Sequence, residues 1–351
     1  MNTFTLGAVP NPKDLRDIHI SQVQTPVSLP YSYKTEISWI PVFNQKNIGS
    51  CVGHAHAIVH IYNEYIENKR IPVLSPRYIY ALSKKLDGLN GQGTYPRVSA
   101  KIESDKGCAT QRTVINDCDL SHEDYINVIE TQEITNDAKP YKIKGYVTVS
   151  NNAEALKQAI YQNGLVLVSI SVGGYTSPIK KGTIGYHRVV VYGWEGDRFF
   201  FRNSWGESWG DKGNGYFDFA DQALIDLMVF TDLPNEIIEE AKKKYRYFSE
   251  KEIIGLKPEL VKMLDDARHL AGIPFVITSG YRTVEHNTEV GGVENSAHIS
   301  GLAVDLRARN SLEHFKITKA LLDVGFKRIS RKYPNHIHCD IDETKPQNVL
   351  F

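Results

Sequence analysis

One cysteine stands at the start of a helical pattern, in the stretch NQKNIGSCVGHA at residues 44–55. After Cys51, apolar side chains recur at spacings of three and four, which predicts an amphipathic helix that begins at the cysteine. These positions are Ala55, Ile58, Tyr62 and Tyr65. The unpaired N–H groups and the dipole of a helix N-terminus favour negative charge, so we expect this thiol to ionise readily to a thiolate.

A catalytic thiolate needs a histidine beside it and a residue that orients the histidine. His187 begins the strand-like run HRVVVYGW, and Asn203 follows 16 residues later with an amide oxygen that can orient the imidazole. Gln45, six residues before Cys51, has an amide that can donate to an oxyanion together with the Cys51 backbone N–H. A cysteine buried as a small hydrophobic residue is the alternative. The three partner residues favour catalysis.

The first part of the chain reads as helices followed by strands. A second helix is predicted at 153–163 and should end at Gly164, because glycine adopts the left-handed conformation that ends many helices. Short runs rich in β-branched and aromatic residues follow, namely LVLVSISV, RVVVYGW, RFFFRNS and GYFDF. This order predicts a helical part and then an antiparallel β part.

Three stretches, NQKNIGSCVGHA, YHRVVVYGW and RNSWGESWGDKGNGYF, resemble the signature blocks of papain-like cysteine peptidases in order and spacing. The resemblance covers about residues 5–232 and implies a helical subdomain followed by an antiparallel, β-barrel-like subdomain. It implies that Cys51 is the nucleophile, His187 the acid and base, and Asn203 the orienting residue. It further implies that Gln45 donates to the oxyanion and that Trp205 shields the Asn–His contact.

The chain departs from this family pattern at several places. Ile48 stands where many members have a disulfide cysteine, Val52 replaces the usual tryptophan after the nucleophile, and Arg188 replaces a small residue after the histidine. We therefore expect a reshaped substrate cleft. The long inhibitory propeptide of the family has no counterpart, so we expect no segment that holds the activity back.

The sequence changes character between residues 232 and 248. With 351 residues the chain exceeds the usual size of one hydrophobic core, and two domains are expected. The stretch NEIIEEAKKKYRYF places acidic residues before basic ones, which favours an exposed helix. We predict a first domain at 1–232, a linker at 233–248 and a second domain at 249–351.

The second domain is predicted to be a small α+β unit with an antiparallel sheet. Ser249 and Glu252 have the spacing of a capping box, and a helix should run from Pro258 to a stop at Gly272. The runs FVITSG, LAVDLRA and HIHCDI are typical of strands, and SLEHFKITKALLDVG predicts a helix between the last two.

Histidines and an aspartate cluster in this second domain. His298 and Asp305 lie in SAHISGLAVD, and His336 and His338 share one face of a predicted strand. Two imidazoles and a carboxylate with an open fourth position are typical of catalytic zinc, so we expect His298, Asp305 and His338 to bind zinc. Cobalt or manganese is compatible with the same ligands. A solvent-facing pair at His336 and His338 is the alternative.

This second block resembles the zinc D-alanyl-D-alanine carboxypeptidases and related peptidoglycan-cleaving peptidases, which share the SxHxxGxAxD stretch and a late HxH. The resemblance covers about residues 245–342. It implies that Arg282 binds substrate and stabilises the oxyanion. Asn335 stands where several relatives have an acid, so His336 is expected to act as the general base and Asp340 to orient a ligand.

Composition limits the other functions. The formal charge is zero and the pI is about 7.2, so nothing in the bulk charge points to nucleic acid or an anionic membrane. We expect no membrane span and no signal peptide, and therefore synthesis in the cytoplasm. The resemblance of the second block implies action at the bacterial cell wall. Four scattered cysteines do not form a disulfide scaffold, and a bridge between Cys108 and Cys118 stays open.

Each cluster has a full set of roles, so neither serves the other. The first hypothesis is a bifunctional peptidase that hydrolyses peptidoglycan, as an endolysin of a phage or a bacterium does, with a Cys-His-Asn site and a separate zinc site. The second is a cysteine peptidase that processes proteins, joined to a zinc domain that cleaves the wall. The third is a component of the phage virion or its assembly that carries these domains. Peptides or peptidoglycan are the expected substrates.

Overall fold

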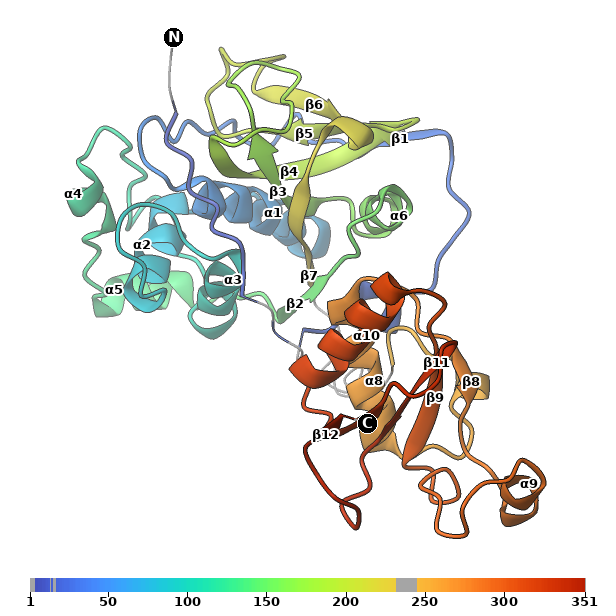
Figure 1. The fold of residues 1–351 in the computed structure, drawn as a ribbon. Helices are drawn as coiled ribbons and strands as arrows, with labels where there is room; N and C mark the ends of the chain where they lie inside the picture. Colours follow the sequence, from blue (N-terminus) through green and yellow to red (C-terminus); the bar gives the residue numbers. More distant parts are fainter. Residues whose placement is uncertain (1–3, 13, 15–16, 232–244, 351) are drawn as a thin grey trace. The chain divides into compact units, whose positions relative to one another are not determined.

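The computed structural model describes residues 4–12, 14, 17–231 and 245–350 (Figure 1). The chain divides into two compact units, residues 1–239 and 240–351, which are described separately. Both units combine helices with sheets, as the sequence predicts. Most of the predicted linker, 233–248, lies outside the described residues.

The helical part of the first unit is built around α1 (Cys51–Asn68), which begins at the cysteine as predicted. It packs against α2 (Pro76–Leu86) and α3 (Pro96–Asp105) and is buried along most of its length. Two short helices, α4 (His122–Ile126) and α5 (Gln132–Ala138), complete this part. The 3-10 turns η1 (Ile20–Gln22) and η2 (Phe219–Asp221) lie outside it.

The β part of the first unit is an antiparallel sheet in the order β2-β7-β3-β4-β5-β6, with β1 paired to β4. Its strands are β1 (Ser32–Lys34), β2 (Gly145–Thr148), β3 (Val166–Val172), β4 (Gly185–Glu195), β5 (Arg198–Arg202), β6 (Asn214–Asp218) and β7 (Leu224–Thr231). The helix α6 (Ala153–Asn163) precedes β3 and ends at Gly164, whose φ is 81°. Along β4, Val189 packs into the sheet's own core while Val190 packs into the core shared with α1.

The second unit is a smaller sheet in the order β12-β10-β11-β9-β8. Its elements are η3 (Glu250–Glu252), α8 (Pro258–Ala271), β8 (Ile277–Ser279), α9 (Val284–Glu289), β9 (Ala303–Arg307), α10 (Ser311–Asp323), β10 (Arg328–Ser330), β11 (His336–Asp340) and β12 (Val349–Leu350). All pairings are antiparallel except β10 with β12, and α8 packs against α10. Phe248, at the end of the predicted linker, is buried in this core.

The cysteines are thiols in this fold. Cys51, Cys108, Cys118 and Cys339 are all free and buried, so the open alternative of a bridge between Cys108 and Cys118 is not realised. Within the described residues, no helix has both the length and the apolar character needed to cross a membrane.

Candidate active sites

The thiol of Cys51 lies where α1 meets β4. Cys51 is the first residue of α1, and the backbone N–H of Arg188 donates to its Sγ atom at 3.4 Å. His187 precedes Arg188 in β4 and hydrogen-bonds through Nε2 to Asn203 Oδ1 at 2.7 Å. Because the amide oxygen can only accept, Nε2 carries the proton and Nδ1 is left as the basic nitrogen. Nδ1 is buried and has no hydrogen-bond partner among the described residues.

Two further predicted residues support this arrangement. The Trp205 ring stacks on His187 with 4.5 Å between ring centroids, so it covers the imidazole. Ser204 Oγ donates to Gln45 Oε1 at 2.7 Å, which fixes the direction of the amide. Gln45 Nε2 then donates to the carbonyl oxygens of Ile48 and Thr5, both at 2.9 Å. The structure thus brings His187, Asn203, Trp205 and Gln45 together. The Cys51 sulfur contacts the next residue of the same strand through the Arg188 N–H, and no hydrogen bond joins it to the His187 ring among the described residues.

Residues 4–9, here called the N-terminal arm, run over this site. The Phe4 ring stacks on Trp205 with 4.7 Å between ring centroids, and the Thr5 carbonyl accepts a hydrogen bond from the side-chain amide of Gln45. The Ala8 N–H donates to the carbonyl oxygen of Tyr186 at 3.2 Å. Sequence reasoning expected no propeptide that holds the activity back, and it did not anticipate that residues 4–9 cover the thiol.

Backbone pairing holds the arm in place. The Thr94 N–H donates to the Gly7 carbonyl at 3.0 Å, and the Val9 N–H donates to the Thr94 carbonyl at 3.1 Å. Gly7 is packed so closely that a Cβ atom there would lie 1.8 Å from the Gly49 carbonyl oxygen. Backbone groups of the arm therefore take up the polar groups of Gln45, Thr94 and Tyr186 beside the thiol.

Burial sets the protonation of the pair. Cys51 and His187 are both 0% exposed. Burial raises the pKa of the Cys51 thiol to about 11, although the N–H groups of Arg188 and Gly7 favour the thiolate. Burial also lowers the pKa of His187 to about 4, against the effect of Asn203. The covered pair is neutral near pH 7, whereas the helix N-terminus alone predicted a thiolate.

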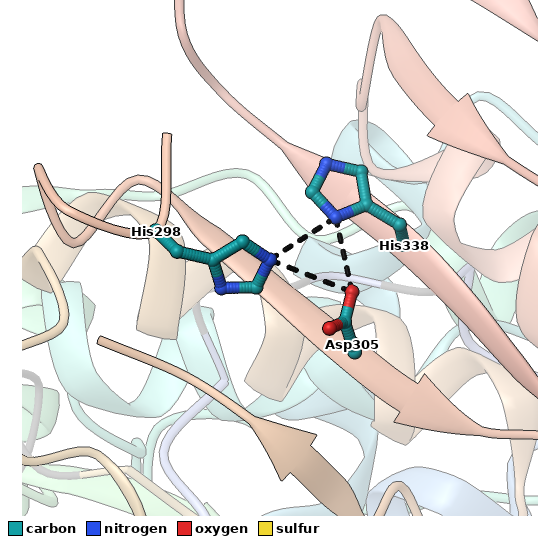
Figure 2. A group of neighbouring side chains, drawn as sticks. All are labelled: His298, Asp305 and His338. Atoms are coloured by element: carbon teal, nitrogen blue, oxygen red, sulfur yellow. Dashed lines mark hydrogen bonds and ion pairs between the residues drawn. The ribbon is translucent and has the colours of Figure 1, made fainter. Parts of the chain in front are cut away.

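The second cluster lies on two paired strands of the smaller sheet. Asp305 in β9 stands directly opposite His338 in β11, so their side chains emerge on the same face. His298 reaches the same point from the turn before β9 (Figure 2). Asp305 Oδ1 lies 3.0 Å from His338 Nδ1 and 3.5 Å from His298 Nε2, and these two nitrogens are 3.3 Å apart.

Outer partners orient both imidazoles. His298 Nδ1 donates to the Gly280 carbonyl at 2.7 Å, and His338 Nε2 donates to Asp340 Oδ2 at 3.1 Å. Asp340 is itself held by Arg328 at 2.8 Å. Sequence reasoning predicted that Asp340 orients a metal ligand. It did not predict that Arg328 holds Asp340, because Arg328 lies on the neighbouring strand β10 and belongs to no recognisable motif.

The electrostatics of this cluster suit a cation. Burial opposes the charge on Asp305, but its hydrogen bonds to both histidines outweigh burial and hold its pKa well below the usual range. Burial lowers the pKa of His338, yet Asp305 and Asp340 outweigh it and raise that pKa. The three inward atoms therefore form a site that attracts positive charge.

The donor set fits zinc. Zinc binds imidazole and carboxylate at about 2.0–2.1 Å in a tetrahedron, so two ligand atoms should lie roughly 3.3–3.4 Å apart. The three separations between the inward atoms, 3.0, 3.3 and 3.5 Å, bracket that value. The outer bonds to Gly280 and Asp340 can keep a proton on the far nitrogen of each histidine, so the inward nitrogens are free to lose theirs when a metal binds.

Two other predicted residues lie near the cluster with different contacts. Arg282 donates through Nη2 to Asp305 Oδ2 at 2.8 Å and through Nε to Ser279 at 2.8 Å, so it holds the carboxylate. His336 is on the same face of β11 but stacks on Tyr333, with ring centroids 4.4 Å apart. The structure does not bring His336 into the group of three.

Comparisons with known proteins agree with this division. The model described as "Papain family cysteine protease" matches residues 31–227, and the model described as "Peptidase M15" matches residues 233–340. Falcipain-2b of Plasmodium falciparum is 26% identical over 208 residues, which is 52% of this chain and 40% of that protein. A probable cysteine protease of Arabidopsis thaliana, RD21C, is 38% identical over 114 residues, 28% of this chain and 25% of that protein. The chain thus spans less than half the length of these curated relatives.

A solved structure shares the fold of the first unit. The crystal structure of xylellain, a cysteine protease from Xylella fastidiosa, has a TM-score of 0.58 and 22% identity. The match covers 65% of this chain and 96% of that one.

Proposed function

The chain belongs to the papain family of cysteine proteases and also carries a Peptidase M15 domain, and from this we propose that it hydrolyses peptide bonds at two separate sites. One observation supports the thiol site most directly. Asn203 holds the His187 ring so that its Nδ1 has no hydrogen-bond partner among the described residues, and the strand that carries His187 also contacts the Cys51 sulfur. The meeting of His298, Asp305 and His338 supports the second site.

At the thiol site, we assign each step of the proposed reaction to one of these residues. Once the arm leaves, His187 Nδ1 takes the proton from Sγ, and Sγ attacks the substrate carbonyl. The amide of Gln45 and the Cys51 N–H stabilise the oxyanion, in the place where Gln45 now holds the Thr5 carbonyl. His187 then protonates the leaving amine, and water hydrolyses the thioester.

At the second site, His298, Asp305 and His338 would hold zinc, which supplies a Lewis acid and lowers the pKa of a bound water. Asp340 keeps His338 in the tautomer that presents Nδ1. Arg282 is partly exposed beside Asp305 and is our candidate for contact with the substrate carbonyl or carboxylate. His336, on the same strand face, is our candidate for the general base.

Peptidoglycan is the proposed substrate. The resemblance of the second block to D-alanyl-D-alanine carboxypeptidases supports it for the zinc site, and one polymer with several kinds of peptide bond gives both sites a common target. The alternative, in which the thiol site acts on proteins, is favoured by the relatives, which are named as proteases.

Digestion of purified peptidoglycan tests the proposal. Products of the parent, Cys51→Ala and His298→Ala are compared by mass spectrometry, with Cys108→Ala and His286→Ala as matched controls away from both sites. Each site variant should remove a different set of fragments. Identical fragments from all five proteins would contradict the wall hypothesis, and a loss with His298→Ala alone would favour a protein substrate for Cys51.

A further inference from the structure

Arg188, the residue after His187, is a charged side chain buried completely beside the thiol. Side chains alternate along a strand, so His187 and Arg188 point to opposite faces of β4. Val190, two residues on, packs into the core shared with α1, which places Arg188 on the side that faces α1. Its backbone N–H meets the Cys51 sulfur. The guanidinium therefore lies at the boundary between the sheet and the nucleophile's helix.

The guanidinium is only partly satisfied. Nη1 donates to Ser169 Oγ at 3.0 Å and to the backbone carbonyl of Asp226. Nε and Nη2 are buried and have no hydrogen-bond partner in the described part of the chain. No described carboxylate forms an ion pair with Arg188. Burial accordingly lowers the pKa of Arg188 to about 10. A buried cation with two free donors is costly unless a partner arrives.

A second buried arginine in the same unit shows the difference. Arg202 donates through Nε to Asn214 at 2.8 Å, and its other nitrogens donate to the carbonyls of Ile40 at 2.9 Å and Ile37 at 3.3 Å. All three nitrogens of this structural arginine are thus satisfied inside the fold. Arg188 lacks such a set, which points to a ligand from outside.

The interior does not offer Arg188 a carboxylate. The buried Glu103 lies behind α1, but His56 takes one of its oxygens at 2.7 Å and His60 the other at 3.1 Å. The carboxylate of Asp226 accepts from the Asn11 N–H at 3.0 Å, while only the backbone carbonyl of Asp226 reaches the guanidinium. Both nearby acids are therefore engaged elsewhere.

The N-terminal chain runs between two neighbours of Arg188, the nucleophile's helix and Asp226. Ala8 packs with Cys51 and Val52, and three residues later Asn11 binds the Asp226 carboxylate. Residues 8–11 read AVPN, so this stretch brings no charge to Arg188. A substrate that replaces the arm would follow the same path past the two free donors.

We infer that Arg188 is a specificity-determining residue of the thiol site and binds a carboxylate side chain of the peptide substrate. The inference rests on the proposed peptidase function. A planar guanidinium with two free N–H groups matches a carboxylate in geometry as well as in charge. The substrate class is a peptide with an acidic residue close to the bond that is cleaved.

The test measures the rate at which peptidyl vinyl sulfones label Cys51 in the full chain, followed by intact mass. The probes have three residues before the reactive group and differ only by Glu, Gln or Leu at one of these positions. The parent should react at least about tenfold faster with Glu than with Gln at one position, because a buried charged pair is formed only with Glu. Arg188→Met should bring this ratio close to one, and Arg188→Lys should keep part of it.

The ratio between probes separates specificity from folding, because a general loss of structure slows both probes alike. Arg198→Met, at an exposed arginine of the same unit, serves as the matched control and should keep the parent's ratio. If Arg188→Met does not fold, the ratio of the labelling rates with the Glu and Gln probes is compared between the parent and Arg188→Lys instead. A parent that labels equally with Glu and Gln overturns the role of Arg188 and leaves the peptidase proposal intact. If no probe labels either the parent or Gly7→Ala, in which the arm is expected to open, the thiol function itself is overturned.

Discussion

The thiol site and the His-Asp-His cluster are built in opposite ways. At the thiol site Cys51 and His187 are fully buried, and the chain's own arm lies over the Gln45 amide. In the second unit the side chains of Asp305 and His338 are 13% and 19% exposed, and outer partners orient the imidazole of His338. The proposed functions therefore require the arm to move at the first site but only a metal ion to bind at the second.

This difference follows from where the groups come from. Asp305 and His338 face each other across two hydrogen-bonded strands, so their separation is fixed by the sheet. The thiol site joins α1 to β4, and the arm is held beside it by backbone pairing with Thr94 and Tyr186. Paired strands thus fix two of the three inward atoms of the second cluster, whereas a separate segment of the chain covers the thiol.

The largest predicted effect is a loss of zinc affinity in the second unit with no change in the reactivity of the thiol. His298→Ala removes one of three ligands, so zinc affinity should fall by more than about 100-fold, beyond the loss that outer partners cause. Labelling of Cys51 should not change. Metal content after dialysis and the rate of thiol labelling are measured on the same sample, with His286→Ala on α9 as control. A change in thiol labelling with His298→Ala would break the separation.

The outer partner of His338 should matter less. Asp340→Asn removes the charge that orients the imidazole and should lower zinc affinity by about 10- to 100-fold. Competition with a chelating dye measures this affinity. Unchanged affinity would mean that the strand pair alone positions His338.

Much of this architecture follows from local sequence patterns. The helices α6 and α8 end at Gly164 and Gly272 as predicted; Gly272 is left-handed, and Gly164 has a positive φ that also suits glycine. The ligand group was also foreseen, since alternation in β11 places His338 on one face and buries Cys339 on the other. These signals depend on neighbours a few residues apart.

The arm and the protonation of the thiol could not be predicted in this way. Thr5 meets Gln45 and Ala8 meets Tyr186 through backbone groups, which carry no side-chain pattern. For Cys51, the helix N-terminus predicts a low pKa, but burial under the arm has the larger effect. The unpartnered guanidinium of Arg188 likewise becomes visible only when every nearby acceptor is known.

A smaller change should open the covered site. Gly7→Ala places a Cβ atom against the Gly49 carbonyl, so the arm should bind less well and Cys51 should react about tenfold faster with iodoacetamide. Gly145→Ala is the matched control, because a Cβ atom there meets nothing within 4 Å. Equal rates for parent, Gly7→Ala and control would show that the arm does not limit access. Zinc binding should be the same in all three.

The smallest expected effect is the response of the arm to pH. The covered thiol has a pKa of about 11, whereas an ordinary thiol has a pKa near 9.0. The closed form therefore holds its proton while the open form loses it, and the stability that this proton gives the closed arm is complete below about pH 9 and falls as pH rises towards 11. Between pH 8 and 9.5 the open fraction should rise about fourfold.

The histidine predicts a matching response at lower pH. The covered His187 has a pKa of about 4, whereas an ordinary imidazole has a pKa near 6.5, so the open form takes up a proton as pH falls below about 6.5 and the closed arm loses stability there. Hydrogen exchange of a peptide spanning residues 4–9, corrected for the intrinsic amide rate, should therefore be slowest near pH 7–8 and rise on either side. A peptide from β9 in the second unit should show no such rise. If exchange in the arm stays flat up to pH 10, the Cys51 proton is not linked to the arm, and the contrast between the covered and the preformed site rests on packing alone.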